Sequence, residues 1–332
     1  MNESTQIRLS LCLPIQEQMM NRQRALIGDP GDRELFELPK YAYIFVMKDK
    51  GDGTWSVWRR EERVLAAGDW VRTRYYGLHA NREDSVFKYD KDIRFILRNE
   101  TLTGKVFAIC SNKKLNFNTA FNSVSNMTQV LDWKFDTSPD SIQENIQNIY
   151  STPYNYIRDG KYYCTFNCTA GTVYNVDLLL YHVASKVDIK WHVDDEVRID
   201  KETPANGVRL TYMEARRLYN GYAYCFQPMR NEVAEMPTTG YTKADLVTES
   251  DEGLWWEGRT YFYTIPFVVT GFSDYFPLQM QLCTNGTDKA NAYRPTLNLE
   301  IDTSDVFVPW LRATFNISQA LEDKEETINV NN

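Results

Sequence analysis

Short segments in which apolar and polar residues alternate recur along this 332-residue chain. A strand with one face in a core and one face in solvent buries every second side chain, so a period of two predicts half-buried β-strands. The first such segment contains Ile7, Leu9, Leu11, Leu13 and Ile15. Further strands are expected at 93–98, 105–111, 162–168, 176–182, 186–193, 207–212, 261–270, 278–283, 294–301 and 306–317. Strands at this spacing predict an all-β protein built from sandwiches.

Residues 41–47 are apolar without a break, which predicts a strand covered on both faces. The polar run 48–53 follows, and its Asp-Gly pair favours the tip of a β-hairpin whose second strand is 54–58. A calcium loop is the competing interpretation. It fails because Gly51 and Gly53 occupy positions where oxygen ligands are needed. A phosphate-binding loop fails as well, since no Gly-Lys-Ser/Thr follows.

The length of the chain exceeds the size at which single hydrophobic cores stop growing, so two domains are expected. One helix interrupts the strands, with Ser138 as its cap, Pro139 in its first turn and an apolar stripe at Ile142, Ile146 and Ile149. It is expected to end near residues 151–153. We therefore predict an amino-terminal sandwich at 1–155 and a carboxy-terminal sandwich at 156–332, with a few short helices.

The formal net charge of −8 and the lack of a basic cluster argue against nucleic acid as a partner. No run of 18 to 20 apolar residues predicts a transmembrane segment. The first residues have neither a basic region nor an apolar core, so a signal peptide would already have been removed from an exported protein. Six scattered cysteines do not indicate a disulfide scaffold, and Cys12 is expected to be a buried strand residue.

No motif for catalysis, a cofactor or a metal stands out. The chain lacks a Gly-x-Ser-x-Gly elbow and has only three histidines. His182 and His192 lie on successive predicted strands, where a ligand pair is conceivable but surface histidines are more common. The acidic run 194–196 is best explained as a solvated turn, with a cation site or half of a glycosidase pair as the alternative. We therefore expect no enzyme and no cofactor.

Two aromatic residues, Trp255 and Trp256, are followed by Tyr261 and Tyr263 and suggest a platform for sugar rings. Adjacent residues of a strand point to opposite faces, so one tryptophan at most would serve a given surface. Plain packing remains the simpler explanation.

Two stretches of the sequence resemble the fimbrillins of Bacteroidales. The first comprises 22–26, 28–31 and 37–46, and the second comprises 152–153 and 176–189. The second stretch lacks the arginine that the family usually has near Tyr181 or His182. The resemblance implies two transthyretin-like β-sandwiches, export as a lipoprotein and assembly into filaments at the cell surface and outer membrane. It also implies trimming by an arginine-specific protease, and Arg24-Ala25 resembles such a junction.

Cleavage at that junction would separate residues 1–24, with the strand from Ile7 to Ile15, from the rest of the chain. The neighbouring strands would then expose unpaired backbone groups beside an apolar groove, which a strand from another subunit could fill. A permanent first strand is the alternative.

The resemblance therefore implies a structural fimbrial subunit, in the stalk or at an accessory or tip position, that joins other subunits by strand exchange. It leaves room for adhesion to a host or bacterial receptor. A carbohydrate-binding or polysaccharide-processing surface protein is the alternative, and a glycosylated eukaryotic or viral β-rich domain is a third option.

Overall fold

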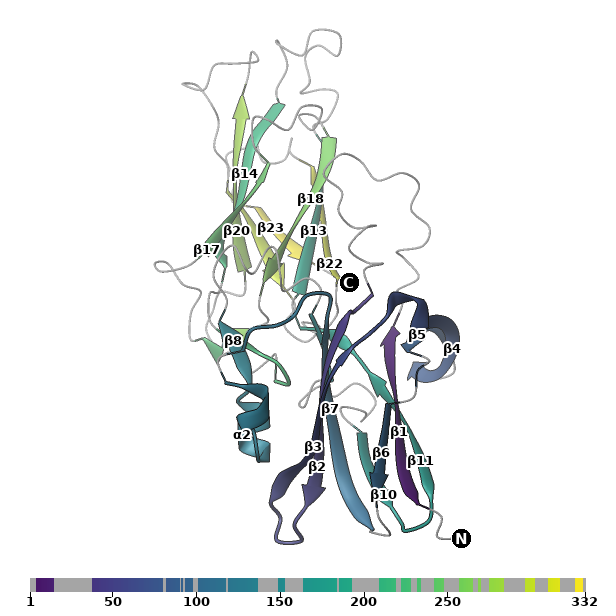
Figure 1. Ribbon diagram of the computed structural model, residues 1–332. Coiled ribbons are helices and arrows are strands. Elements are labelled where there is room, and N and C mark those ends of the chain that lie inside the picture. The colour runs from purple at the N-terminus through teal and green to yellow at the C-terminus, as the bar shows by residue number, and fades with distance from the viewer. Residues whose placement is uncertain are drawn as a thin grey trace.

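In the computed structural model, the elements of the described residues are almost all strands (Figure 1). It describes residues 4–14, 38–79, 82–89, 91, 93–97, 101–117, 119–136, 149–152, 164–183, 185–192, 209–218, 222–227, 232–233, 242–247, 257–264, 268–269, 275–283, 296–301, 310–316 and 326–330. Within these residues the helical elements are the short helix α2 (Met127–Leu131) and two 3-10 turns, Ala67–Asp69 and Phe121–Ser123. The predicted all-β fold is confirmed.

The first sheet, which we call sheet A, is built around the amino-terminal strand. Its described strands follow the order β11-β1-β5-β4, and β6 pairs with β1 as well. These strands are β1 (Thr5–Pro14), β4 (Trp70–His79), β5 (Arg82–Tyr89), β6 (Ile93–Leu97) and β11 (Val173–Leu179). The predicted strand at residues 7–15 is therefore present over its described part, and it lies in the interior of a sheet.

The second sheet, sheet B, faces sheet A. Its order is β12-β9-β7-β2-β3, with β10 also paired to β7. The strands are β2 (Tyr41–Asp49), β3 (Trp55–Val64), β7 (Leu102–Ser111), β9 (Ile149–Ser151), β10 (Cys164–Cys168) and β12 (Tyr181–His182). The predicted hairpin joins β2 to β3, and Gly51 and Gly53 supply the positive φ angles, 83° and 84°, that its turn requires.

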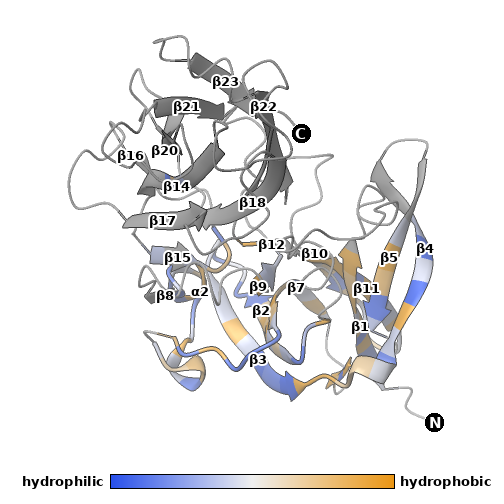
Figure 2. Ribbon diagram, turned by 90° about the horizontal axis from the view of Figure 1, so that it is seen from above, coloured by the Kyte–Doolittle hydropathy of each residue, from blue (hydrophilic) through white to orange (hydrophobic). Residues whose placement is uncertain are grey.

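The inner core lies between the two sheets. Ile7, Leu9, Leu11 and Leu13 of β1 are buried there with Ile44 of β2 and other residues of both sheets. Buried and exposed residues alternate along β6, for example, and Figure 2 shows both apolar and polar residues on the strands of these sheets. The alternation places one set of side chains in the core and leaves the other set on the outside.

The other face of sheet B is covered too. We call this second cluster the outer core: it contains Tyr43, Phe45 and Phe107 from the sheet, together with Val130 of α2 and the following Trp133. Helix α2 begins after Asn126, whose side chain accepts a hydrogen bond from the Gln129 N–H at 3.0 Å. Because both faces of β2 are covered, residues 42–47 are all buried, as the unbroken apolar run predicted.

Most of the remaining described strands form further sheets, and the two larger of these sheets lie at the other end of the molecule in Figure 1. Three strands follow the order β18-β13-β22, five follow β17-β14-β20-β21-β23, and β16 pairs with β19. These strands are β13 (Ser185–His192), β14 (Arg209–Leu218), β16 (Glu232–Val233), β17 (Thr242–Val247), β18 (Glu257–Thr264), β19 (Val268–Val269), β20 (Tyr275–Cys283), β21 (Thr296–Ile301), β22 (Trp310–Asn316) and β23 (Glu326–Val330).

The strands that follow residue 155 do not all belong to these later sheets. β10, β11 and β12 pair with β7, β1 and β9, which precede that residue. The pairing therefore joins residues on both sides of the predicted boundary at 155. The division into two domains stays a prediction.

The prediction that a helix extends to residues 151–153 is wrong. Ile149, which the 3.6-residue spacing placed on the apolar stripe, is buried in β9, where Ser151 pairs with Ile109 and Ile149 with Ser111. Residues 149–151 pair with the edge of β7 that does not pair with β2. This pairing satisfies their backbone hydrogen bonds and overrides the local preference for helix. The earlier part of that helix, at 138–148, lies outside the described residues.

Candidate functional site

Strand β1 occupies a slot between strands on both of its sides. From Gln6 to Cys12 it pairs in parallel with β11. On its other side Thr5–Leu9 pairs antiparallel with β6 and Cys12–Pro14 with β5. Two separate partners thus share that side of β1, and all three neighbours would expose backbone groups if β1 left.

The inner face of β1 fills the centre of the inner core. Ile7 and Leu11 have no exposed surface, and Leu9 and Leu13 are 2% and 7% exposed. Burying four such side chains contributes about 6 to 12 kcal/mol. This contribution is as large as the net stability of a typical domain, about 5 to 15 kcal/mol.

The outer face of β1 is half-buried at Gln6, Arg8 and Ser10 but fully buried at Cys12. Burial raises the pKa of the Cys12 thiol to about 12, with a further contribution from the negative charge of Asp177. The Lys88 Nζ and the Asp177 Oδ1 lie 2.9 Å apart. Lys88 is opposite Cys12 on β5, and Asp177 is opposite Ser10 on β11. This ion pair therefore crosses the outer face of β1.

The amino-terminal end of β1 is held by a side chain. The Thr5 hydroxyl is buried and accepts a hydrogen bond of 2.7 Å from the Gly171 N–H, in the turn between β10 and β11. Gly171 has φ of 80°, which glycine adopts without steric cost. The Gln6 N–H donates to the Thr172 carbonyl at 2.9 Å. Thr5 thus anchors the strand to the same turn as the backbone does.

Ile15, Arg24 and Ala25 lie outside the described residues, so cleavage at the predicted junction stays a prediction. Sequence reasoning found Ile7, Leu9, Leu11 and Leu13 but missed Thr5, Lys88 and Asp177. Thr5 lies two residues before Ile7 on the same face of the strand, so the alternation could have predicted that it is buried. The ion pair joins residues 89 positions apart, and no local signal indicates it.

The other predicted sites receive no support. His182 lies in β12 of sheet B and His192 in β13, which pairs with β18 and β22, so the two strands are not partners. The acidic run 194–196 and the aromatic pair Trp255-Trp256 lie outside the described residues. In the part of the chain that the structure describes, no three His, Cys, Asp or Glu side chains gather as metal ligands would.

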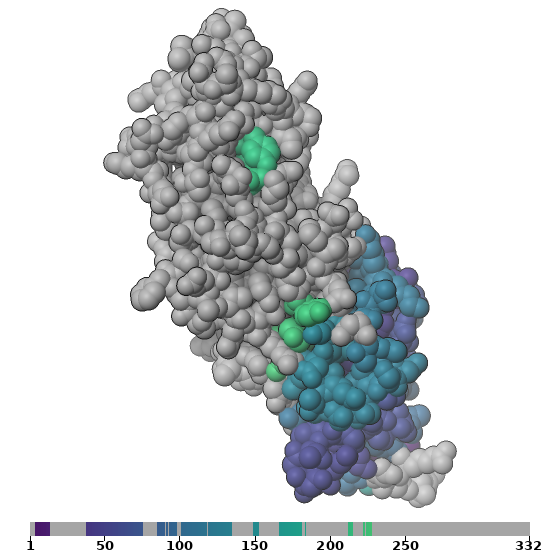
Figure 3. Space-filling view, turned by 90° about the vertical axis from the view of Figure 1, so that its left-hand side faces the viewer, coloured from purple at the N-terminus to yellow at the C-terminus, as the bar shows by residue number. Residues whose placement is uncertain are grey.

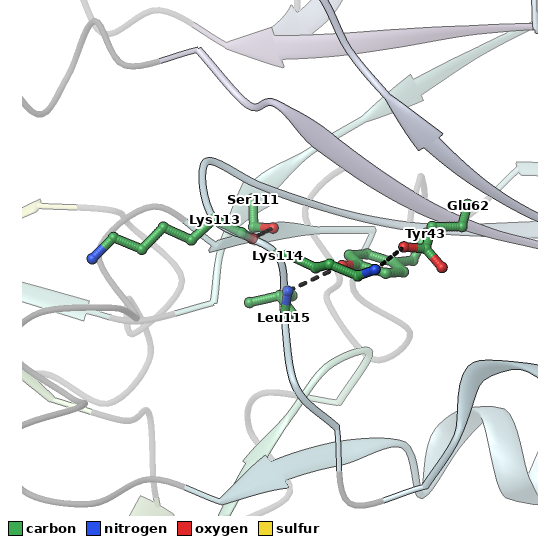
Figure 4. A network of polar contacts seen from close by, with 6 residues as sticks. All are labelled: Tyr43, Glu62, Ser111, Lys113, Lys114 and Leu115. Atoms are coloured by element: carbon green, nitrogen blue, oxygen red, sulfur yellow. Dashed lines mark hydrogen bonds and ion pairs between the residues drawn. The ribbon is translucent and has the colours of Figure 1, made fainter.

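A polar network secures the segment that follows β7 (Figure 4). The Tyr43 hydroxyl accepts a hydrogen bond of 3.0 Å from the Leu115 N–H, and burial raises the pKa of Tyr43. Lys114 Nζ lies 3.5 Å from Glu62 Oε1 of β3, and the Ser111 hydroxyl donates to the Lys113 carbonyl at 2.5 Å. These contacts hold residues 111–115 beside the outer core.

Besides the pairing of β10, β11 and β12 with earlier strands, a further contact joins the amino-terminal and carboxy-terminal halves of the chain. Strand β15 (Tyr222–Tyr224) pairs with β8 (Lys134–Asp136), and the Lys134 Nζ lies 3.6 Å from the centroid of the Tyr222 ring. Cys225 and Phe226, which follow, are buried in the outer core. Figure 3 shows this green segment against the blue-teal surface of the amino-terminal half. The carboxy-terminal half therefore contributes to a core of the amino-terminal half.

No protein-family model and no curated protein matches the chain. Solved structures do match. A candidate cell adhesion protein from Parabacteroides distasonis aligns over 98% of this chain and 95% of its own, with 11% identity and a TM-score of 0.50. A fimbrial assembly protein from the same species aligns over 99% of both chains, with 11% identity and a TM-score of 0.49. The tip fimbrial protein Mfa3 from Porphyromonas gingivalis, in a form with a C-terminal truncation, aligns over 88% of this chain and 81% of its own, with 11% identity and a TM-score of 0.44.

The match to the Parabacteroides adhesion protein covers nearly all of both chains, so the two share a fold. Two proteins described as fimbrial are also among the solved structures that match the chain. None of the described helices has the length and apolar character required to cross a membrane.

Proposed function

We propose that the protein is a structural subunit of a bacterial cell-surface fimbria, in which β1 occupies a slot that a strand of another subunit can fill. The position of β1 carries the proposal: it lies between β11 on one side and β5 and β6 on the other. The resemblance of the sequence to fimbrillins and the fimbrial structural neighbours support it. The role needs no catalysis and no cofactor.

The energetics of the slot explain why it would not stay empty. Loss of the four buried side chains of β1 would remove about 6 to 12 kcal/mol of burial, enough to unfold a typical domain. Each buried N–H or C=O left without a partner would cost about 1 to 3 kcal/mol more. A chain without β1 therefore gains most from a replacement strand, which supplies backbone hydrogen bonds and apolar side chains together.

Processing by an arginine-specific protease would start this exchange. Cleavage after Arg24 leaves β1 bound by noncovalent contacts alone, so a strand of another subunit at high local concentration can compete with it. The filament would form at the cell surface, outside the outer membrane, where such a protease and the other subunits are accessible.

The test is digestion of the full chain with an arginine-specific protease. Mass spectrometry identifies the cleavage site, and size-exclusion chromatography and chemical denaturation follow its effect. We expect cleavage after Arg24 to produce multimers or a clear loss of stability. A double variant, Arg22→Lys with Arg24→Lys, keeps both charges and removes the site, so it should stay monomeric and stable. A cleaved wild-type chain that is a monomer with unchanged unfolding contradicts the proposal.

A further inference from the structure

The slot of β1 differs along its length, and this difference determines which strands it accepts. Resting on the proposed function, we propose that the slot selects a donor strand with three features. The strand has a hydroxyl residue at the site of Thr5, four alternate apolar residues after it, and a small residue at the site of Cys12. The donor is a terminal strand of a different subunit that carries this pattern.

Four apolar sites form the inner side of the slot. The side chains of Ile7, Leu9, Leu11 and Leu13 lie in the inner core with Ile44 and other residues of both sheets. A polar residue at any of the four sites would be buried without a partner. This requirement fixes a period of two over seven residues, which most amphipathic strands fulfil, so it gives affinity but little discrimination.

The site of Cys12 discriminates by size. Its side chain is on the outer face of sheet A, yet it has no exposed surface. The Lys88–Asp177 ion pair crosses β1 on this face between strands β5 and β11. A large side chain at this site would have to displace the covering groups, and overfilling a packed site is unfavourable.

The site of Thr5 discriminates by hydrogen bonding. The Thr5 Oγ1 accepts the Gly171 N–H at 2.7 Å, and the Thr5 side chain is fully buried. An apolar residue of the same shape would leave the Gly171 N–H without this acceptor. A serine keeps the acceptor and should be tolerated.

The pattern excludes one occupant within the chain itself. Strand β23 already pairs with β21, and residues 326–332, which include it, carry one hydroxyl residue, Thr327, followed two positions later by Asn329. Two alternate apolar residues, Ile328 and Val330, are too few for the four sites. The β1 of a second copy fits but fills its own slot. We therefore expect the donor to come from another kind of subunit.

Synthetic peptides test the pattern. The full chain is cleaved after Arg24 and refolded with fluorescent peptides of residues 5–14, and affinity is measured by anisotropy. The variants are Cys12→Ala, Cys12→Leu, Arg8→Leu, Thr5→Val and Thr5→Ser. Arg8→Leu is the matched control, because it puts the same leucine on the same face at a site that already holds a long side chain.

We expect Cys12→Leu to bind about tenfold more weakly or worse, and Cys12→Ala and Arg8→Leu to stay within about threefold of the native peptide. Thr5→Val should lose about tenfold, and Thr5→Ser should restore most of the affinity. Equal binding of the Cys12→Leu peptide overturns the size limit while strand exchange stands. Failure of the native peptide to bind overturns strand exchange, and this inference with it.

A second measurement does not depend on strand release. In the uncleaved chain, Cys12→Leu should lower the midpoint of urea unfolding and Arg8→Leu should leave it nearly unchanged. Equal midpoints for the two variants show that the Cys12 site has room for a large side chain, which overturns the inference about its size.

Discussion

Strands β1 and β2 are both interior strands of their sheets, but they are held in different ways. β2 pairs with β3 from Tyr41 to Asp49 and with β7 from Tyr41 to Lys48, and both of its faces are buried. β1 has two partners in succession on one side, and among the described residues its inner face belongs to the inner core while no residue of its outer face belongs to either core. β2 also continues through a tight turn into β3, whereas β1 is the first of the described strands.

The difference teaches which interior strand can leave a sandwich. Removal of β2 would open the inner core and the outer core together, because Ile44 belongs to one and Phe45 to the other. Removal of β1 would open the inner core alone, and the outer core around Trp133 would keep its contacts. A replaceable strand is thus one that serves a single core.

The largest effect is expected for Phe45→Ala in β2. Phe45 is fully buried and contacts the rings of Phe121, Trp133 and Phe226 with centroid distances of 4.9, 5.0 and 6.0 Å. Truncation should lower the free energy of unfolding by about 3 to 5 kcal/mol. Urea denaturation measures the loss, and Val64→Ala, at a residue that is 73% exposed, is the control with little change. A loss of less than about 1 kcal/mol would show that the outer-core face of β2 contributes little to stability, which would contradict the contrast between β2 and β1.

A somewhat smaller loss is expected for Leu9→Ala in β1, about 2 to 5 kcal/mol, because truncating leucine leaves a smaller cavity than truncating phenylalanine. The two strands should differ most in rescue. After cleavage at Arg24, excess native peptide of residues 5–14 should restore the stability of the Leu9→Ala chain, since it replaces the damaged strand. The same peptide should do nothing for Phe45→Ala. Rescue of both variants, or of neither, would remove the distinction between β1 and β2. Ile96→Ala, at an exposed site on β6, is the control substitution.

The smallest effect concerns alkaline pH. Burial raises the pKa of Cys12 to about 12 and raises that of Cys110 in β7 as well. The folded chain then keeps protons that the unfolded chain loses above about pH 8.5, so stability falls as pH rises from about 9 toward 12. Each thiol should contribute a slope of about 1.4 kcal/mol per pH unit.

Urea denaturation of the uncleaved chain between pH 8 and 10.5 measures this slope. Cys12→Ala and Cys110→Ala should each reduce the pH slope of the free energy of unfolding by the contribution of one thiol. After cleavage and release of β1, the Cys12→Ala substitution should no longer change the slope, whereas Cys110→Ala still should. An unchanged slope in the uncleaved Cys12→Ala chain would mean that Cys12 is not buried as described.

The sequence predicted the strands that show a regular alternation or an unbroken apolar run, and it missed strands in which charged residues mask both patterns. β1, β2 and the hairpin after β2 follow the expected pattern. β4 and β5 were not predicted, because charged residues such as Arg72 and Arg74 occupy their exposed positions and no clear apolar period stands out. They form nevertheless, since β5 pairs with both β4 and β1. The sequence predicted the end of a helix at β9, because β9 forms through its pairing with β7 and the local sequence does not indicate that partner.

The candidate site was predictable on one face only. The apolar residues of β1 are marked by their spacing, but the ion pair over Cys12 depends on the register of three strands that are far apart in the sequence. Register follows from the whole sheet, and a shift by one residue would move Lys88 to the other face. Local sequence carries no trace of this relation.

The parallel pairing of β1 with β11 has a consequence for any assembly built on this slot. An incoming strand that keeps the pairing of β1 runs in the same direction as β11 and opposite to β5 and β6, so the two subunits at the junction contribute unlike surfaces. A contact between unlike surfaces that does not close into a ring generates an open helical fibre. Such a fibre has two chemically distinct ends. A subunit that donates a strand can be added only at the end where the β1 slot is unfilled.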